Sequence, residues 1–106
     1  MEPMPLIVTL CGSTRFVEDF NYWRKELTLQ GQIVLSIEIV TTQSKEEDPQ
    51  HCDPETKAML DELHLRKIDL SDYIFVINKG GYIGESTRRE IKYAESNNVL
   101  IKYLEN

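Results

Sequence analysis

Apolar residues follow two different periodicities along the chain. Short β-branched runs predict buried strands, and longer segments with apolar residues three or four positions apart predict amphipathic helices. Strands are expected at 5–12, 32–40, 72–78 and 98–104, and helices at 14–30, 55–71 and 87–97. Gly31 should end the first helix, and Pro54 stands near the first position of the second. The aromatic residues Phe16, Phe20 and Trp23 share one helix face and are expected in the core.

The predicted strands and helices alternate strictly, and the strand runs are apolar on both faces. This pattern predicts an α/β fold with a parallel sheet covered by helices. Right-handed crossovers then favour a Rossmann-like or flavodoxin-like three-layer sandwich with a small parallel sheet of about four strands. With 106 residues the chain is long enough for a single domain, 1–106, and too short for two.

Composition narrows the range of partners. The formal net charge of -6 argues against an extended nucleic-acid surface, although it leaves room for a small anionic ligand. The sequence has no apolar run of membrane-spanning length and no recognisable signal peptide, so a cytoplasmic location without membrane contact is expected. The two cysteines fit a reducing compartment. The triplet at 51–53 contains metal-ligand types but has no second cluster, so neither a metal nor a cofactor is expected.

Two loops should lie at the carboxyl edge of the sheet, where such folds bind ligands. The first is CGSTR, 11–15. Gly12 allows a close backbone approach, Ser13 and Thr14 offer hydroxyls, and Arg15 offers a fork of donors beside a helix N-terminus. Together they suit a phosphate or a carboxylate. In the simpler alternative, Ser13 or Thr14 only caps the helix. Cys11, which precedes the glycine, is expected to be a small buried hydrophobe.

The second loop is GGYIGESTRRE, 80–90. Gly81 and Gly84 make it a flexible turn through which the backbone can approach a ligand. Tyr82 projects from this turn, and its ring either stacks on a ligand or plugs the loop. The spacing is not that of the dinucleotide-binding fingerprint.

The end of this loop also matches a helix-capping box. In that interpretation Thr87 caps the helix and Glu90 folds back onto the Thr87 backbone N–H. Arg88 and Arg89 would then lie in the first turn, where cations oppose the helix dipole. A bound anion or the Glu90 carboxylate would compensate them.

His64 is the remaining candidate for chemistry. It lies on the second predicted helix, with Asp61, Asp69 and Asp72 nearby in the sequence. It is either an acid or base of a site, or an ordinary surface or half-buried histidine.

Both loops, in this order, resemble the nucleoside 2-deoxyribosyltransferase superfamily, which includes the deoxynucleoside 5′-monophosphate N-glycosidases. The resemblance covers most of the chain and is greatest to small, mostly uncharacterised members, including phage-type proteins. The segments that carry it are LIVTLCGSTRF, DLSDYIFVINKGG, GESTRREIKYA and NVLIKYL.

The resemblance implies a glutamate nucleophile, here Glu90, that attacks the anomeric carbon of a nucleoside or nucleotide. The 5′-phosphate and substrate contacts would come from Gly12, Ser13, Arg15, Gly81, Tyr82, Gly84, Ser86, Thr87 and Arg88. The relatives are oligomers, so a homodimer or a higher homo-oligomer is expected.

Two departures from the family pattern keep other functions open. Lys92 stands where the family has glycine, and His64 stands near the position of an aspartate that assists the leaving base. These departures favour a non-catalytic nucleotide-binding module, acting as a sensor or sponge. A third alternative is an unrelated Rossmann-like interaction domain in which Glu90 only caps a helix.

Overall fold

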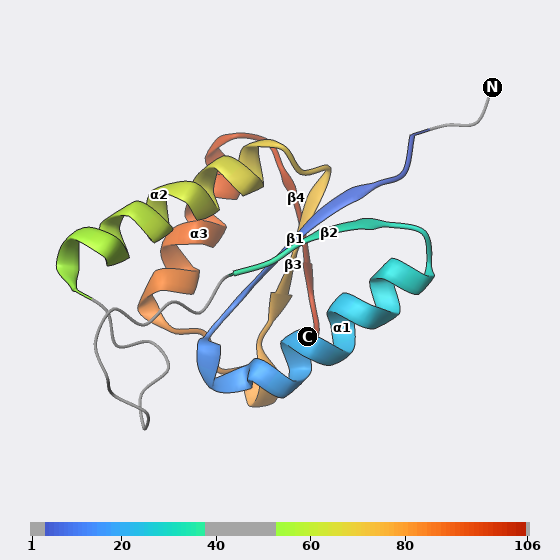
Figure 1. Cartoon of the computed structure of the whole chain (residues 1–106), viewed down its shortest axis with the longest axis horizontal. Coiled ribbons are helices and arrows are strands. Elements are labelled where there is room, and N and C mark those ends of the chain that lie inside the picture. Colours follow the sequence, from blue (N-terminus) through green and yellow to red (C-terminus); the bar gives the residue numbers. More distant parts are fainter. Residues whose placement is uncertain (1–3, 38–52, 106) are drawn as a thin grey trace.

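Four parallel strands and three α-helices follow one another in the order that the sequence predicts (Figure 1). The computed structural model describes residues 4–37 and 53–105. The elements are β1 (Ile7–Gly12), α1 (Val17–Leu29), β2 (Ile33–Leu35), α2 (Pro54–Asp69), β3 (Tyr73–Ile77), α3 (Glu85–Ser96) and β4 (Leu100–Tyr103). The last three positions of the strand predicted at 32–40 lie outside the described residues. Within the described ranges, no helix has the length and apolar character needed to cross a bilayer.

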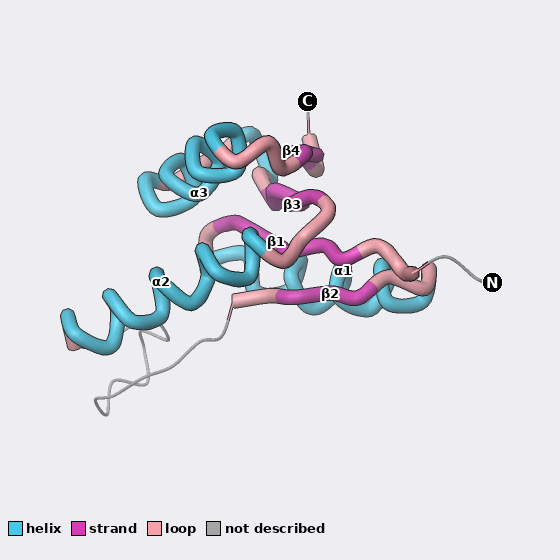
Figure 2. The backbone as a smooth tube through the Cα atoms, turned by 90° about the horizontal axis from the view of Figure 1, so that it is seen from above, coloured by secondary structure: helices cyan, strands magenta, loops and turns pink. Residues whose placement is uncertain are grey.

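The strands form one sheet in the order β2-β1-β3-β4 (Figure 2). Every neighbouring pair is parallel. α1 covers one face, and α2 and α3 cover the other (Figures 1 and 2). The predicted α/β sandwich is therefore confirmed, with a flavodoxin-like strand order. In this order the chain reverses direction across the sheet between β1 and β3, which makes their carboxyl ends the expected ligand site.

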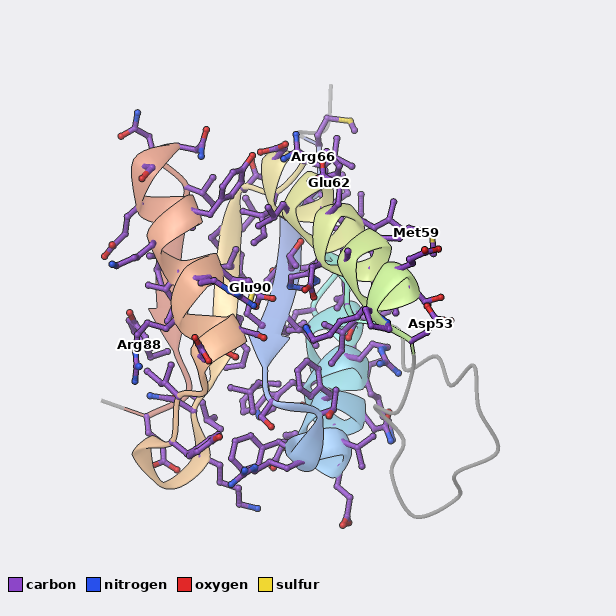
Figure 3. The ribbon with its side chains drawn as sticks, turned by 90° about the vertical axis from the view of Figure 1, so that its left-hand side faces the viewer. Asp53, Met59, Glu62, Arg66, Arg88 and Glu90 are labelled. Carbon is purple, nitrogen blue, oxygen red and sulfur yellow. The ribbon has the colours of Figure 1, made fainter. Side chains whose placement is uncertain are left out.

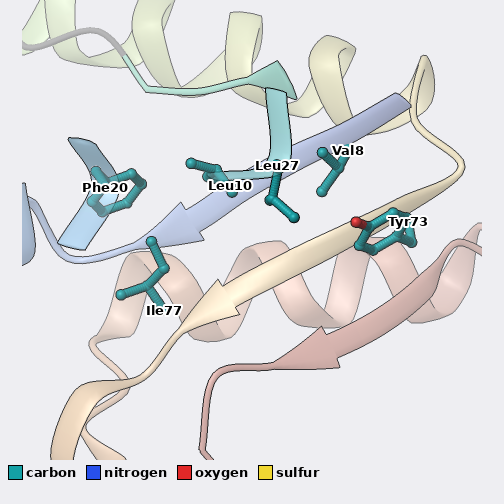
Figure 4. Close-up of a cluster of buried hydrophobic side chains, with 6 residues drawn as sticks. All are labelled: Val8, Leu10, Phe20, Leu27, Tyr73 and Ile77. Atoms are coloured by element: carbon teal, nitrogen blue, oxygen red, sulfur yellow. The ribbon is translucent and has the colours of Figure 1, made fainter. Parts of the chain in front are cut away.

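Each face of the sheet has its own core. Alternate residues of β1 point to opposite faces, as the strand period requires. The α1 side buries Val8, Leu10, Phe20, Leu27, Tyr73 and Ile77 (Figure 4). The side of α2 and α3 buries Cys11, Ile68, Ile74, Val76, Ile91 and Ala94. Phe16 and Trp23 pack against the first cluster, so the aromatic face of the first helix is core, as predicted.

The ends of the first two helices follow from local hydrogen bonds. The Ser13 hydroxyl accepts the Arg15 N–H at 3.2 Å, and a 3₁₀ turn, Thr14–Phe16, precedes α1. α1 therefore begins later than the predicted position 14. Gly31 follows it with a φ of 85°, confirming the predicted glycine stop. α2 begins at Pro54, as expected, and the Asp53 carboxylate accepts the Thr56 N–H at 2.7 Å.

The predicted capping box on α3 is wrong. The helix begins at Glu85, two residues earlier than predicted, and its N-cap, Gly84, makes no side-chain cap. Thr87 is 3% exposed, because it shares the buried helix face with Ile91 and Ala94. Its hydroxyl therefore neither caps the helix nor lines the cleft described below. Glu90 is the sixth helical residue and cannot fold back as a capping box requires.

The same shift changes the interpretation of the two arginines. They occupy the fourth and fifth helical positions, and Glu85 supplies an acidic residue in the first turn. The expected conflict with the helix dipole is therefore small, because that effect fades beyond the first turn. The arginines by themselves no longer call for a bound anion.

The glycine loop after β3 is fastened to the chain beyond β4. The Asn78 side chain donates to the Glu105 carbonyl and accepts the Glu105 N–H, both at 2.9 Å. The Gly80 N–H donates to the Glu105 carboxylate at 2.9 Å. Gly80 and Gly81 have φ values of 66° and 82°, which favour glycine. The loop thus has a defined conformation rather than free glycine flexibility.

Candidate functional site

A cleft of about 380 Å³ separates α2 from α3 (Figure 3). Its lining residues recur three or four positions apart, so each helix presents one face to it. They are Ala58, Asp61, Glu62 and Leu65 of α2, and Ser86, Arg89, Glu90 and Tyr93 of α3. Both helices begin at the carboxyl edge of the sheet, because each crossover returns from that edge. The volume falls within the roughly 300–1,000 Å³ of small-molecule sites.

Glu90 lies between α3 and the sheet, facing α2 (Figure 3). Its side chain is 14% exposed, and a carboxylate oxygen lies 3.6 Å from His64 Nε2. The same nitrogen lies 3.4 Å from the Cys11 Sγ at the end of β1. The fold thus brings together the two residues that the sequence singled out for catalysis, and it adds Cys11 as a third.

Burial is the main influence on the Glu90 carboxyl. Loss of solvation raises its pKa from 4.5 to about 7. A hydrogen bond from the Cys11 thiol lowers the pKa, the negative charge of Asp61 raises it, and Arg89 and Lys57 lower it. A buried carboxylic acid that titrates near neutrality beside a cleft is typical of functional sites.

Burial also keeps the neighbours of Glu90 uncharged. It lowers the pKa of His64 from 6.5 to about 4, the charge of Lys67 lowers it further, and Asp61 opposes the change. The imidazole is therefore neutral at neutral pH, and its contact with Glu90 is not an ion pair. Burial likewise raises the pKa of the Cys11 thiol, which remains protonated. His64 Nδ1 is shielded from solvent and has no hydrogen-bond partner among the described residues.

The two predicted loops meet at the point where the chain reverses between β1 and β3. The Arg15 guanidinium stacks on the Tyr82 ring, 4.0 Å from its centroid, and Phe16 meets the same ring edge-on. The Tyr82 ring thus packs on Arg15 and Phe16. This position matches the alternative in which Tyr82 plugs the loop. Gly12 is sterically required, since a Cβ there would lie 2.9 Å from the Ile77 carbonyl oxygen.

The hydroxyls and glycine beside these rings have different surroundings. Ser13 accepts a backbone N–H, as the capping alternative predicts. The Thr14 hydroxyl oxygen is shielded from solvent and has no hydrogen-bond partner among the described residues. At Gly84 a Cβ would lie 3.3 Å from the Tyr82 hydroxyl, so this glycine makes room for the tyrosine.

The two adjacent arginines of α3 point in different directions. Arg89 lines the cleft and donates to the Ser86 hydroxyl at 3.3 Å. Arg88 points away from α2 and donates to the Ile83 carbonyl at 3.4 Å (Figure 3). Arg88, which the sequence suggested as a ligand residue, is therefore outside the cleft, and Arg89 is inside it. Lys92 is exposed and does not line the cleft, so it does not crowd it.

One of the three aspartates near His64 in the sequence belongs to the site. Asp61 lines the cleft and pairs with Lys57 at 3.0 Å. Asp69 accepts the Tyr93 hydroxyl, and Asp72 accepts a backbone N–H of β1. The latter two aspartates therefore hold elements of the fold together.

Cys11, His64 and Glu90 also have the donor atoms of a metal site. Their sulfur, nitrogen and oxygen atoms all lie within 4.8 Å of one another. From the sequence, only the 51–53 triplet drew attention as a group of metal-ligand residue types. Two of its members, His51 and Cys52, lie outside the described residues. Asp53, its third member, caps α2.

Comparison with known proteins adds no assignment to this geometry. No protein-family model matches the chain, and no curated protein matches it significantly. The site must therefore be interpreted from its own residues.

Proposed function

We propose that the protein cleaves the N-glycosidic bond of a (deoxy)nucleoside 5′-monophosphate, by hydrolysis or by deoxyribosyl transfer. Glu90 is the proposed nucleophile. The observation that supports this most directly is a nearly buried carboxyl group at the side of a small-molecule-sized cleft, with a pKa of about 7. Such a group opposes folding when it ionises, so a structural role does not account for it.

The chemistry proceeds in two displacements. The ionised Glu90 carboxylate attacks the anomeric carbon as the bond to the base breaks, and the base leaves with the electron pair and takes up a proton. The sugar is then held as an ester on Glu90. Water, or the nitrogen of a second base, attacks the same carbon and restores the carboxylate. Hydrolysis and transfer differ only in this second nucleophile.

A second carboxyl group is available as a general base, to accept the proton of the attacking water in the second displacement. Asp61 faces Glu90 across the cleft and is near enough for its charge to raise the Glu90 pKa. Paired carboxyl groups flanking the scissile bond are the usual equipment of glycoside cleavage. His64 is a poor proton donor, since its imidazole is neutral at neutral pH. We therefore assign His64 a positioning role, in contact with Glu90 Oε1.

The phosphate is proposed to bind near the first turn of α3. Arg89 and Ser86 line the cleft there, and the helix N-terminus supplies backbone N–H groups. Arg15 and the Thr14 hydroxyl, which has no partner within 4–37 and 53–105, offer further donors at the neighbouring loop. Arg15 forms no ion pair with any carboxylate in 4–37 or 53–105, so its charge is available to an anion.

The test is release of free base from a panel of deoxynucleoside and ribonucleoside 5′-monophosphates, followed by chromatography with chelator present. Glu90→Ala and Glu90→Gln should abolish release, because neither variant has a carboxylate to attack the sugar. Glu95→Gln is the matched control, since Glu95 is an exposed glutamate of the same helix.

Release that persists in both Glu90 variants would remove Glu90 as the nucleophile. Nucleotide binding without release from any member of the panel would replace catalysis with the binding-module function.

A further inference from the structure

Three metal-binding side chains converge from three separate elements beside the cleft. Cys11 comes from the end of β1, His64 from α2 and Glu90 from α3. Their spacing in the sequence is wide, so only the fold brings them together. A thiol, an imidazole and a carboxylate are all ordinary ligands of Zn²⁺.

The distances fit a tetrahedral ion. Zn²⁺ bonds of about 2.3 Å to sulfur and about 2.0–2.2 Å to nitrogen and oxygen place neighbouring ligand atoms roughly 3.3–3.6 Å apart. His64 Nε2 lies 3.4 Å from Cys11 Sγ and 3.6 Å from Glu90 Oε1. Two of the three ligand-to-ligand distances therefore already match a tetrahedron. The third, between the Cys11 sulfur and a Glu90 carboxylate oxygen, is within 4.8 Å.

The surroundings also favour a cation. Cys11 and His64 are 0% and 4% exposed, so the backbone and neighbouring packing fix their positions. Among the described residues, neither Lys nor Arg forms an ion pair with the nearly buried Glu90 carboxylate. Buried carboxylates are commonly paired or bound to a metal. Of the three ligands, Glu90 also lines the cleft, so the cluster adjoins the cleft on that side.

We propose that Cys11, His64 and Glu90 form a binding site for a zinc-class divalent cation, with the fourth coordination position open to the cleft. Binding replaces the Cys11 thiol proton, and the Glu90 proton where present, and releases them to solvent without redox change. A thiolate and an imidazole select zinc-class ions over Mg²⁺ and Ca²⁺. A further consequence rests on the proposed function: the bound ion occupies the Glu90 carboxylate and inhibits base release.

The direct test adds Co²⁺ to the metal-free protein. A thiolate-to-cobalt charge-transfer band and intense tetrahedral visible bands are expected at one ion per chain, and Zn²⁺ should displace them. Competition with a chromogenic chelator then gives the zinc affinity. Cys11→Ser should remove the charge-transfer band and weaken zinc binding at least about 100-fold, because losing a ligand exceeds the 10–100-fold effect of losing its supporting partner.

Two further variants keep the result decisive. Cys52→Ser should leave the band unchanged, whereas loss of the band in this variant and not in Cys11→Ser would overturn the site. Glu90→Gln should also weaken zinc binding, which guards against misfolding of the Cys11 variant, and circular dichroism checks both. No charge-transfer band in the unaltered protein, or zinc binding unaffected by Cys11→Ser and Glu90→Gln, would equally overturn it.

Activity separates this inference from the proposed function. Zinc binding with no base release under chelator would support the metal site and refute the glycosidase. Base release that is insensitive to Zn²⁺, in protein shown to hold the ion at Cys11, would refute inhibition.

Discussion

Replacing Glu90 with glutamine should stabilise the protein at alkaline pH. In the folded state burial raises the pKa of this carboxyl from 4.5 to about 7, so the folded chain binds the proton more tightly than the unfolded chain. Its contribution to stability is fully present below pH 4.5 and is lost as pH rises from 4.5 to 7. Glutamine has a similar shape but does not ionise, so the variant should not show this loss.

The size of the effect follows from the difference in pKa, about 2.5. At 1.36 kcal/mol for each pKa unit, the unaltered protein loses about 3 kcal/mol from Glu90 between pH 4 and pH 8. The glutamine amide costs about 1 kcal/mol where it lacks an acceptor. The variant is therefore expected to be about 2 kcal/mol more stable than the unaltered protein at pH 8, and no more stable at pH 4.

The neighbours of Glu90 act in both directions and are already included in this pKa. Asp61 from α2 opposes ionisation, whereas Lys57 from α2, Arg89 from α3 and the Cys11 thiol from β1 favour it. His64 does not enter at pH 8, because it is neutral in both the folded and the unfolded chain.

Urea unfolding at pH 4, 6 and 8, with chelator present, measures the effect. Trp23 is the only tryptophan and packs against the core, so its fluorescence reports unfolding. Glu95→Gln, at an exposed position of the same helix, is the matched control. A stability difference between Glu90→Gln and the unaltered protein that is the same at pH 4 and pH 8 would refute the reasoning.

Three other changes test neighbouring parts of the structure. His64 should contribute a loss of about 3 kcal/mol as pH falls from 6.5 to 4, opposite in sign to Glu90, because its folded pKa of about 4 lies below the ordinary 6.5; the stability of His64→Gln relative to the unaltered protein should therefore rise by that amount over this range, which urea unfolding of both proteins below pH 7 checks. Gly12→Ala should cost about 1–3 kcal/mol in thermal unfolding, since its Cβ would meet a carbonyl oxygen at 2.9 Å, and an unchanged melting temperature would contradict this. Arg89→Ala should raise the KM for a nucleoside monophosphate about tenfold or more, with Arg88→Ala as the matched control; equal effects would remove Arg89 from the phosphate site.

The architecture was predictable because it rests on patterns that neighbouring residues reveal. β-branched runs such as IVTLC and YIFVI are buried on both faces, and only a parallel sheet between helices satisfies them in this order. The N-terminal boundaries of helices were less predictable. The match to a capping box at Thr87 depends on where the helix begins, and the helix begins at Glu85, with Thr87 buried as its third residue.

The candidate site was predictable only in part. Glu90 and His64 were found from residue type and resemblance, but their contact depends on the packing of α3 against α2. Cys11 was correctly expected to be buried. Its contact with His64 was not predictable, because the two residues are 53 positions apart in the sequence. The choice between Arg88 and Arg89 depends on helix phase, which the two-residue error in the start of α3 obscured. Asp61 could have been found from its one-turn spacing to Leu65 on the cleft side of α2.

The attachment of the glycine loop to Glu105 has an evolutionary consequence. Glu105 holds Asn78 and Gly80 by three hydrogen bonds, although it lies about 25 residues further along the chain. Selection on the loop therefore also acts on a residue that has no chemical role. Two of these bonds use the Glu105 backbone, which any residue supplies, so Asn78 should be the more constrained of the two positions. Lineages that lose the acidic residue lose only the bond to the Gly80 N–H.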